Sequence, residues 1–371
     1  MTDGENDSRV IKHLDANALR HNIDVVKRYA RGCRVLAVVK ADAYGHGIEF
    51  AVRALSGNAG DSTVDGFAVA TVDEAIALRR SDSQSPVWVL SDCSIQSNYR
   101  AIIDQQLSPV IHDATQIDAL NQLERMPDEV IVKTDTGMGR LGFSPDKVVD
   151  IVNHLRAHGV INIRLMSHLA NADHTDDTYT TTQIERFEAL AQQLDLECSL
   201  ANSAGVLAWP TSHYKRVRPG IMMYGVSPIL AQSADHFDLK PVMTLSTRVL
   251  SIREFDAGQP VGYGGTYVCS QPTRAALLAC GYGDGYPRQA PSGTEVRFKQ
   301  GLGRLIGRVS MDSIAVNISN FRGIEIGQRV VLWGRGLPAE QIAAQCDTIA
   351  YDLFCGLTSR VTASECFDGI D

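Results

Sequence analysis

The sequence predicts a two-domain α/β protein, with an N-terminal (β/α)8 TIM barrel and a C-terminal, mainly β domain. Short apolar runs alternate with helical patterns, eight such runs fit into about 225 residues, and their starts lie roughly 20–35 residues apart. After Leu239 the pattern changes to short runs separated by Gly, Pro and Asp turns. We therefore place the barrel at residues 12–238 and the β domain at 239–371, with a strand at 8–12 joined to the latter.

Length and composition exclude several classes of protein. The chain has 371 residues, a formal net charge of −8 and no basic stretch that would hold nucleic acid or an anionic membrane. Its N-terminal segment is polar and acidic, unlike a signal peptide, and no apolar run approaches the ~20 residues of a membrane helix. Eight cysteines are scattered without Cys-x-x-Cys or metal-finger spacing, which is typical of free thiols in a reducing compartment. We expect a soluble, cytoplasmic protein without a metal.

The first predicted elements are a short strand and a helix. Val10–Lys12 has a β-like composition, and Asp15 is placed as the N-cap of the helix that follows. Apolar residues then recur on one helical face, at Leu19, Ile23, Val26 and Ala30. The next apolar run, Val35–Val39, is short, β-branched and uninterrupted, so it predicts the buried first strand of the barrel.

Seven further strands complete the predicted barrel. They are Gly66–Ala70, Val87–Leu90, Ser108–Ile111, Val130–Lys133, Ile163–Ser167, Cys198–Ala201 and Arg216–Tyr224. Thr71 and Glu74 have the spacing of a capping box, which predicts that a helix begins directly after the second strand. An open doubly wound sheet shows the same alternation, but it has fewer strands and requires an early Gly-x-Gly-x-x-Gly motif that this sequence lacks.

The second domain is predicted from short strands between turn residues. These strands are Val242–Leu245, Thr247–Ile252, Ala275–Ala279, Leu305–Val309 and Val330–Leu332. One modest helix is predicted among them, at Pro338–Cys346.

Lys40 stands at the end of the first barrel strand. A loop with an aromatic residue and two glycines follows it, at Tyr44, Gly45 and Gly47. Most lysines at strand ends simply reach solvent. A lysine at the mouth of a parallel barrel can instead form a Schiff base if burial lowers its pKa. The loop that follows Lys40 favours this functional interpretation.

Other polar residues lie where the remaining strands end, which is where barrel enzymes carry their active sites. A glycine-rich loop with Arg140 follows Lys133, and the sixth strand ends at His168. The segments after strands seven and eight, the usual phosphate-binding place of this fold, contain Asn202, Ser203, Arg218, Gly220 and Ile221. Each signal is weak alone, because a Ser-Ala-Gly often only starts a helix, a barrel histidine is mostly a core residue, and an arginine can be an ion-pair partner. Combined with the strand-end lysine, they predict a phosphorylated aldehyde, and pyridoxal phosphate fits that description.

The group that faces the pyridine nitrogen of such a cofactor bears on the reaction. An arginine is permanently charged, so Arg218 would only donate a hydrogen bond and keep that nitrogen unprotonated. The weaker electron sink suits the removal and return of one Cα proton, as in racemisation, which needs a base on each face of the substrate. Lys40 would be one base, and Tyr263, held between glycines in the β domain, is a candidate for the other. A turn tyrosine that only packs is an equally good interpretation of Tyr263 taken alone.

Seven motifs follow one another along the chain: VVKADAYGHG, KTDTGMGRLG, NSAG, RPGIMMYG, VGYGGTY, GYGDGYPR and GRVSMD. In residues and in order they resemble the alanine racemase family, the fold-type III pyridoxal phosphate enzymes, and the match runs from about Val10 to Val361. The resemblance implies an isomerase that interconverts L- and D-alanine by a two-base mechanism and supplies D-alanine for peptidoglycan.

The resemblance also implies roles for single residues. Lys40 matches the lysine that holds the cofactor and acts on D-alanine, whereas Tyr263 matches the base that acts on L-alanine from the other subunit of a head-to-tail homodimer. The other cofactor-binding positions are Tyr44, His168, Asn202, Ser203, Arg218, Gly220 and Ile221, with Arg218 at the pyridine nitrogen. The groups around the substrate carboxylate match Arg140 and the backbone of the partner's copy of Met311. Two supporting positions are Lys133, which is carbamylated in some members, and Tyr282, in the passage to the site.

Three departures from the family pattern affect specificity. Many members have a histidine beside the pyridine-facing arginine, where this chain has Ser199. Many have a tyrosine before the Arg-Val near the C-terminus, where this chain has Ser359. The proline and arginine that usually follow that Arg-Val are Thr362 and Ala363. The departures leave the reaction intact but weaken strict specificity for alanine, so a broader amino-acid racemase is one alternative.

Two rival functions share parts of the pattern. A fold-type III decarboxylase for a dibasic amino acid also has a barrel, a β domain and a strand-one lysine, but it needs a reactive cysteine loop that is not found in this sequence. A non-enzymatic carrier of pyridoxal phosphate would be a single barrel, and the whole β domain with Tyr263 argues against it.

Overall fold

The computed structural model describes residues 8–56, 64–82, 84–92, 96–229 and 232–367. The chain divides into two compact units, of which one comprises Leu19–Leu239 and the other Met1–Ala18 with Lys240–Asp371. In the described part of the chain, no helix is both long and apolar enough to span a membrane.

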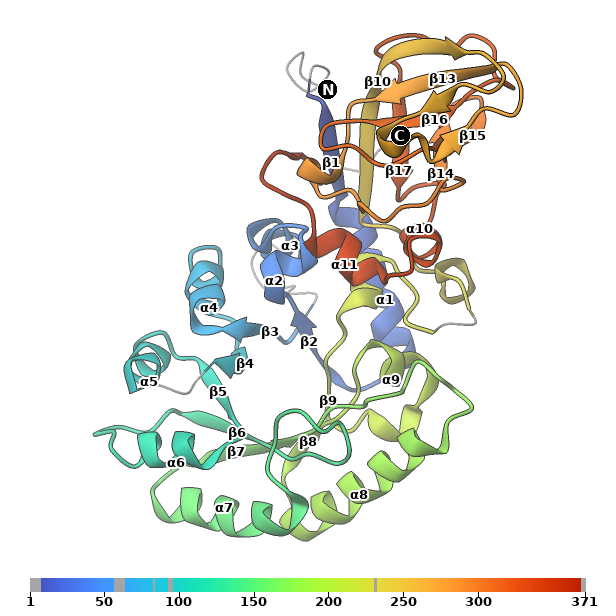
Figure 1. Cartoon of the computed structure of the whole chain (residues 1–371). Coiled ribbons are helices and arrows are strands. Elements are labelled where there is room, and N and C mark those ends of the chain that lie inside the picture. The colour runs from blue at the N-terminus through green and yellow to red at the C-terminus, as the bar shows by residue number, and fades with distance from the viewer. Residues whose placement is uncertain (1–7, 57–63, 83, 93–95, 230–231, 368–371) are drawn as a thin grey trace. The chain divides into compact units, whose positions relative to one another are not determined.

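The Leu19–Leu239 unit is a closed barrel of eight parallel strands, which confirms the predicted barrel (Figure 1). The strands are β2 (Arg34–Val38), β3 (Gly66–Thr71), β4 (Val87–Asp92), β5 (Ser108–Ile111), β6 (Glu129–Lys133), β7 (Asn162–Met166), β8 (Glu197–Ser199) and β9 (Arg216–Val217). The central residues of β2 to β6 are mostly apolar because a barrel strand is buried on both faces. Parallel pairing gathers all eight carboxyl ends at one end of the barrel.

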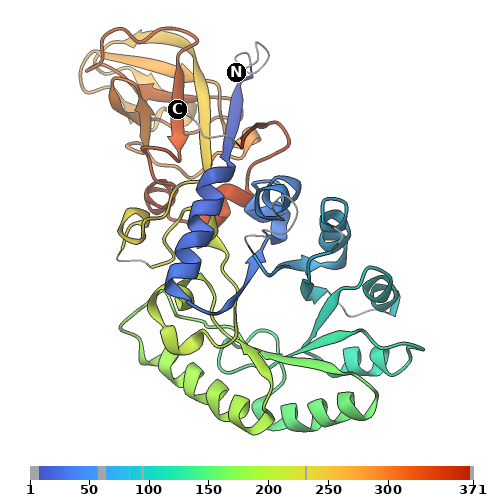
Figure 2. The same ribbon diagram turned by 180° about the vertical axis from the view of Figure 1, so that it is seen from behind.

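Helices follow the strands and surround them (Figure 1). They are α1 (Ala16–Tyr29), α3 (Ile48–Ser56), α4 (Val72–Arg79), α5 (Gln96–Asp104), α6 (Ala114–Leu120), α7 (Pro145–Ala157), α8 (Thr178–Leu194) and α9 (Ser203–Ala208). Figure 2 brings α1 to the front.

Two predicted helix starts are confirmed by their hydrogen bonds. A carboxylate oxygen of Asp15 accepts from the backbone N–H groups of Asn17 and Ala18, at 2.9 and 3.0 Å. Thr71 Oγ1 accepts from Glu74 N at 3.2 Å while Glu74 Oε2 accepts from Thr71 N at 3.2 Å, so the capping box of α4 is formed.

The eighth barrel strand is shorter than the sequence predicts. The prediction of one strand over Arg216–Tyr224 is wrong, because β9 ends at Val217 and a 3-10 helix, η3 (Ile221–Tyr224), follows. Pro219 has no N–H for a strand ladder, and Gly220 permits the turn that redirects the backbone. This break forms the loop that carries Arg218 and Gly220.

The other unit is built on one eight-stranded sheet, in the order β13-β16-β15-β14-β17-β10-β1-β18, and confirms the mainly β character predicted for this part. The strands are β1 (Val10–Asp15), β10 (Met243–Phe255), β13 (Thr273–Leu278), β14 (Glu295–Phe298), β15 (Gly301–Ile306), β16 (Ile314–Asn317), β17 (Arg329–Trp333) and β18 (Thr362–Cys366). Because β13 also pairs with β10, the sheet curls back on itself. A separate hairpin joins β11 (Pro260–Val261) and β12 (Tyr267–Val268).

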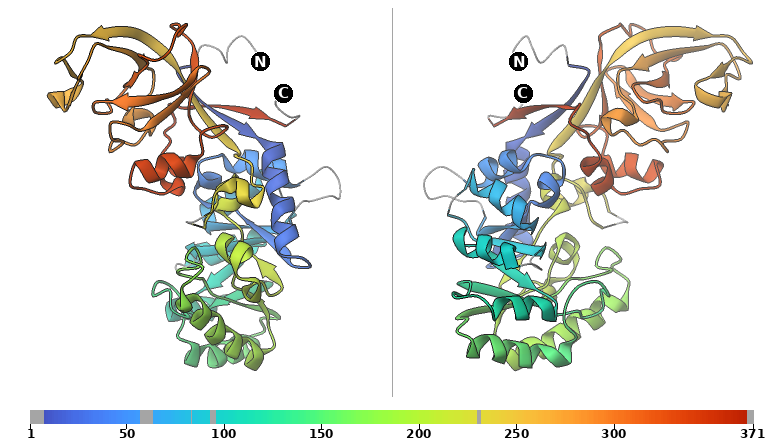
Figure 3. Two further views of the ribbon diagram at one scale, coloured as in Figure 1. Left: turned by 90° about the vertical axis from the view of Figure 1, so that its right-hand side faces the viewer. Right: turned by 60° about the vertical axis from the view of Figure 1, so that its left-hand side comes forward.

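Two details of this unit differ from the prediction. The runs Val242–Leu245 and Thr247–Ile252 are not two strands but parts of β10, which is long and continuous (yellow in Figure 3). The pairing of β10 with β17 shifts register between Leu245 and Ser246. The alternation of apolar residues is interrupted there, although the strand itself continues. The single helix expected at Pro338–Cys346 is α10 (Ala339–Gln345), but a second helix, α11 (Ala350–Cys355), follows it.

Near the amino ends of the barrel strands, four charged side chains and a tryptophan form a network, which we call the floor cluster. The Arg164 guanidinium bonds Glu129 at 2.7 Å and also contacts Glu197. Glu197 pairs with Arg216 at 2.6 Å. The Trp88 indole N–H donates to Glu129 at 2.9 Å, and the Arg216 guanidinium lies 5.8 Å from the centre of the Trp88 ring. Every charge of the floor cluster therefore has an opposite partner.

Candidate active site

Lys40 lies at the carboxyl end of β2 and is half-buried. The ladder between β2 and β3 ends with a 2.9 Å bond from Val39 N to Ala68 O, directly before it. A tight turn, labelled α2 (Lys40–Tyr44), follows, and its residues Ala41, Asp42 and Ala43 are left-handed. The turn ends the strand abruptly at Lys40, so this residue stands at the barrel mouth.

Lys133 and Arg140 belong to one glycine-rich loop after β6. The loop is folded around the Asp135 carboxylate, which accepts from Gly137 N at 2.8 Å and from Gly139 N at 2.9 Å. The Lys133 side chain is buried and Arg140 is exposed. Among the described residues, the Lys133 ammonium has no hydrogen bond or ion pair.

The pKa of Lys133 records the electrostatic environment at the mouth. Desolvation, then the positive charges of Arg140, Arg218 and Lys40, lower this pKa from 10.5 to about 8. Among the described residues, Asp135 is the only carboxylate whose charge acts on Lys133, and it raises the pKa. The structure therefore brings together Lys40, Lys133, Arg140 and Arg218, as their positions at strand ends predict.

Arg218 is buried and held by neutral oxygen atoms. It donates to Ser199 Oγ at 2.5 Å, to the Ser167 carbonyl at 2.6 Å and to the Leu200 carbonyl at 3.3 Å. Ser199 Oγ donates in turn to the Arg216 carbonyl at 2.8 Å. Burial lowers the pKa of the guanidinium to about 10, which still leaves it charged at neutral pH. Arg218 is thus a fixed, donor-only cation.

His168 follows β7 in the same cationic region. Desolvation, then the charges of Arg218, Lys133, Arg140 and Lys40, lower its pKa well below 6.5. His168 is therefore neutral at physiological pH. A neutral imidazole can stand beside an aromatic ring without adding a further charge.

The segments after β8 and β9 form a cradle of hydroxyl and backbone N–H groups. Ser203 Oγ accepts from Gly220 N at 2.8 Å and from Met222 N at 3.3 Å, so its own O–H is left to donate. No acceptor for that O–H is found among the described residues. Ile221 is the first residue of η3, so its N–H has no acceptor within that helix. Asn202 fixes the start of α9 by accepting from Gly205 N at 2.9 Å.

Tyr44 closes one side of this cradle. A Cβ atom at Gly220 would come within 2.5 Å of the Tyr44 hydroxyl, so only glycine permits this approach. The Tyr44 ring lies 5.0 Å from the ring of Tyr224. With the cations near Lys40, the donors of the cradle fit a phosphorylated, anionic ligand that reacts with an amine, as pyridoxal phosphate does.

Tyr263, Tyr282 and Met311 lie on the other unit, and all three are exposed, at 67%, 39% and 52%. The loops of Tyr282 and Met311 are joined by bonds from Tyr282 N to Ser310 O, at 3.0 Å, and from Gly283 N to Met311 O, at 2.8 Å. A Cβ atom at Gly264 would lie 3.2 Å from an Arg308 guanidinium nitrogen, so the turn that carries Tyr263 packs on the segment leading to Met311. The three residues therefore belong to adjoining loops of this unit.

Sequence reasoning missed how the mouth is braced. Ser167 was identified only as a strand end, yet its carbonyl accepts from Arg218 and its hydroxyl bonds Thr136 Oγ1 at 3.0 Å. Glu74 was identified only as a capping residue, yet its other oxygen accepts from Ala41 N at 2.7 Å. No local sequence pattern predicts either contact, because both join segments that are distant in sequence.

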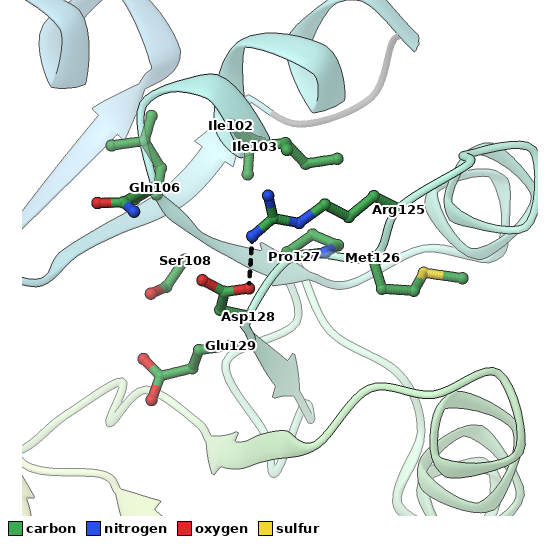
Figure 4. A pocket seen from close by; sticks show the side chains of 10 residues that line it. Ile102, Ile103, Gln106, Ser108, Arg125, Met126, Pro127, Asp128 and Glu129 are labelled. Carbon is green, nitrogen blue, oxygen red and sulfur yellow. Dashed lines mark hydrogen bonds and ion pairs between the residues drawn. The ribbon is translucent and has the colours of Figure 1, made fainter.

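A small cavity lies at the opposite end of the barrel from Lys40, beside the starts of β5 and β6 (Figure 4). Ile102, Ile103 and Met126 line it with the exposed ion pair of Arg125 and Asp128, at 3.1 Å. Its volume of about 50 Å³ has room for water but not for a cofactor.

The fold is that of a (β/α)8 barrel with a second, mainly β unit, and the barrel mouth gathers Lys40, Lys133, Arg140 and Arg218 into one cationic cluster. Comparison with known proteins gives the family. The family model "Alanine racemase, N-terminal domain" matches residues 14–228, and "Alanine racemase, C-terminal domain" matches residues 242–364. The chain belongs to the alanine racemase family of isomerases.

Curated relatives and solved structures agree with this assignment. The chain is 43% identical over 346 residues to an alanine racemase of Pseudomonas entomophila, covering 93% of this chain and 95% of the relative. It is 42% identical over 346 residues, with the same coverage, to a Pseudomonas putida protein named "Alanine racemase, catabolic".

Two solved structures resemble the chain over nearly its whole length. The biosynthetic alanine racemase of Pseudomonas aeruginosa has a TM-score of 0.92 and 39% identity, covering 97% of this chain and 99% of that one. The alanine racemase of Bartonella henselae, described with covalently bound pyridoxal phosphate, has a TM-score of 0.88 and 26% identity, covering 97% and 100%.

Proposed function

We propose that the chain interconverts L- and D-alanine with pyridoxal phosphate, using Lys40 and Tyr263 as its two bases. The observation that carries this proposal is the group of cations around Lys40. It lies next to a cradle in which the Ser203 O–H and the Ile221 N–H can donate to a phosphate. The family assignment favours the racemase over a decarboxylase or a cofactor carrier.

Residues of the barrel mouth would hold the cofactor. The Lys40 amine would form the covalent bond to its aldehyde carbon. Tyr44, Ser203 and the Ile221 N–H would hold the phosphate, while Gly220, whose N–H donates to Ser203, orients that hydroxyl. His168 would lie beside the ring. Asn202 contributes by fixing the start of α9.

Arg218 would face the pyridine nitrogen. A guanidinium has five N–H donors and no acceptor, so it can bond to that nitrogen's lone pair but cannot give up a proton to it at neutral pH. Ser199 and the Ser167 carbonyl fix its orientation. Pyridoxal phosphate, when bound, delocalises the negative charge that develops at the substrate Cα. The donor-only partner limits this delocalisation, which suits return of a proton to the same carbon.

Two bases would then act on opposite faces of Cα. Tyr263 Oη would take the proton from L-alanine, and Lys40 Nζ would deliver a proton to the other face; the reverse reaction exchanges the roles. Arg140, which Lys133 would support once carbamylated to an anion, and the backbone N–H of Met311 would hold the substrate carboxylate. Tyr282 would line the passage to the site.

We propose that the site is completed by a second copy of the chain in a head-to-tail homodimer. Tyr263 and Met311 are exposed large side chains although they are assigned to catalysis and substrate binding, and burial against a partner would account for this. Each copy would lend these residues to the mouth of the other.

The direct test is a chiral assay of the purified chain with added pyridoxal phosphate. L-alanine and D-alanine should each be converted to the equal mixture. A panel with serine, lysine and ornithine, with trapping of released carbon dioxide, tests specificity. Comparable racemisation of several amino acids would favour a racemase of broader specificity. The small Ser359 side chain, which stands where many family members have a tyrosine, is consistent with that alternative. Release of carbon dioxide without racemisation would refute the proposal.

Mixing two inactive variants tests the shared site. Lys40→Ala and Tyr263→Phe should each be inactive, but a mixed dimer contains one mouth with both bases. Activity should therefore return on mixing. If equal amounts exchange subunits at random, half of the dimers are mixed and each has one of its two sites intact, so activity should reach about a quarter of the wild-type level. No recovery, with subunit exchange proven by labelled chains, would place Tyr263 in its own chain's site.

The cellular role follows from the product. We propose that the enzyme acts in the cytoplasm and supplies D-alanine for peptidoglycan. The free cysteines among the described residues accord with a reducing compartment. Expression of the chain should restore growth of a bacterium that requires D-alanine, whereas Lys40→Ala should not.

A further inference from the structure

The backbone that follows Lys40 is held in a conformation that needs support. Ala41, Asp42, Ala43 and Tyr44 all have positive φ, at 52°, 52°, 52° and 54°. In this left-handed region the Cβ atom of an L-residue crowds the following carbonyl, so runs of such residues are rare. They persist only where surrounding contacts hold them.

Internal bonds close the far end of the turn. Ala43 N donates to Val39 O and Gly45 N to Ala41 O, both at 2.9 Å, and the Asp42 carboxylate accepts from Ile48 N at 2.7 Å. The N–H nearest to Lys40, that of Ala41, is instead bound from another element. It donates to Glu74 Oε1 at 2.7 Å.

The second oxygen of Glu74 binds the end of the neighbouring strand. Oε2 accepts from Ala70 N at 2.7 Å and from Thr71 N at 3.2 Å. The β2–β3 ladder has its last bond between Val39 N and Ala68 O. Just beyond this point, one carboxylate bonds to backbone donors of both segments, so it ties the exit of β2 to the exit of β3.

Helix α6 shows that capping alone does not need the second oxygen. Its capping box uses Gln116, whose Oε1 accepts from His112 N at 2.7 Å and from Asp113 N at 3.0 Å. The Gln116 Nε2 is buried and has no partner among the described residues. An amide therefore suffices to cap in this geometry, and the contact of Glu74 with Ala41 is an addition to the cap.

We propose that Glu74 is a positioning residue for Lys40, which holds the left-handed turn so that the lysine amine stays at the barrel mouth. This inference deepens the proposed function and rests on it for the role of Lys40. Glu74 acts through the backbone of Ala41. A carboxylate is required because two backbone donor sites must be met by two acceptor oxygens.

The test compares Glu74→Gln with wild type. The glutamine keeps the oxygen that the cap needs, as Gln116 does, but turns an N–H2 group toward the Ala41 N–H. Gln116→Ala is the matched control, because it removes a cap of the same geometry whose side chain does not bond to the turn that follows Lys40. Hydrogen exchange is measured on the full-length chain without added cofactor, in the peptide spanning residues 38–48. The dissociation constant of pyridoxal phosphate and the kcat and KM for alanine are measured on the same proteins.

In Glu74→Gln, we expect hydrogen exchange in this peptide to be about 10-fold faster. The dissociation constant of pyridoxal phosphate should rise about 10-fold, which corresponds to a loss of about 1.4 kcal/mol in binding free energy. With the cofactor saturating, kcat should fall while KM for alanine stays unchanged, because Lys40 acts on Cα and does not hold the carboxylate. Gln116→Ala should alter none of these. If Glu74→Gln fails to fold, Glu74→Asp takes its place. Aspartate keeps the charge but is too short to reach both Ala41 N and the N–H groups at the end of β3.

Two results would overturn the proposal: wild-type exchange and cofactor binding in Glu74→Gln, or the same changes in Gln116→Ala. The exchange measurement needs neither cofactor nor substrate. A wild-type chain without racemase activity would therefore refute the proposed function, whereas the exchange data would still decide whether Glu74 holds the turn.

Discussion

The two ends of the barrel carry the same kinds of charged residue in opposite arrangements. In the floor cluster, Arg164 and Arg216 are each bonded to a glutamate. At the mouth, Lys133 lies among the charges of Lys40, Arg140 and Arg218, with Asp135 as the one carboxylate that acts on it. That carboxylate is already bonded to backbone N–H groups of its loop.

The difference separates structural from functional charge. Taking an unpaired cation out of water costs free energy, so a protein folded for stability alone would pair it. The floor cluster follows this rule, whereas Lys133 at the mouth departs from it. An anionic ligand would supply the missing negative charge, which favours the mouth as the proposed binding site and the floor as part of the scaffold.

The largest expected effect comes from removing the central cation of the mouth. Lys40→Ala should lower racemisation by about 10³-fold or more, because both the covalent attachment and one base are lost. It should also abolish the covalent retention of the cofactor after borohydride treatment, which mass spectrometry of the washed protein measures. Thermal unfolding should be nearly unchanged. Wild-type retention of the cofactor would refute the assignment.

Breaking the floor cluster should have the opposite effect: stability should fall while activity is retained. Arg164→Met leaves two glutamates without their shared partner, so the free energy of unfolding should fall by about 3 kcal/mol in urea. The side chains are about one-fifth exposed, which keeps the effect at the lower end for a buried pair. Its kcat/KM should stay near wild type. Arg125→Met, which breaks the exposed pair with Asp128, is the control and should barely change stability. A large loss of kcat/KM in Arg164→Met would contradict the division between the two ends.

Lys133 tests the unpaired charge itself. Its folded pKa, about 8, lies below the unfolded value of 10.5, so the unfolded chain binds more protons between these pH values and stability rises with pH across them. Without ligand and in buffer free of carbon dioxide, Lys133→Met should therefore raise the free energy of unfolding at pH 7 by about 3 kcal/mol. The gain should shrink between pH 8 and 10.5.

Bicarbonate extends the Lys133 experiment. A neutral lysine amine adds carbon dioxide to give a carbamate and a proton, which would turn this cation into an anion among cations. Bicarbonate should then stabilise the wild type but not Lys133→Met, and labelled carbonate should give a carbamate signal by NMR only in the wild type. Equal responses would show that Lys133 remains an amine.

His168 gives the smallest expected effect. Its pKa in the folded chain lies well below 6.5, so below about pH 6.5 the unfolded chain takes up a proton that folded His168 refuses. Stability should therefore fall as the pH decreases, by at most about 1.4 kcal/mol per pH unit from this residue. His168→Gln should flatten the urea-unfolding profile in this range. An unchanged slope would mean that His168 is not held neutral.

The sequence predicts the barrel well because its strands are short apolar runs bounded by turn residues. Glu74 and Asp15 were recognised as capping residues since a cap depends on neighbours within a few positions. The same local reasoning misplaced the end of β9, where Pro219 and Gly220 stop the strand inside an apolar run. It also divided β10 in two, because a register shift looks like a strand end when the partner strand is unknown.

The sequence by itself determined the fold class and the order of the motifs, and it predicted the residues that we propose carry the chemistry. These depend on residue type and on spacing along the chain. Only the tertiary structure decided that Lys133 is buried among other cations, that Ser199 and Ser167 hold Arg218, and that Glu74 reaches Ala41. Burial and hydrogen bonding between distant segments set the pKa of Lys133 and the orientation of Arg218, and such contacts exist only after the barrel has closed.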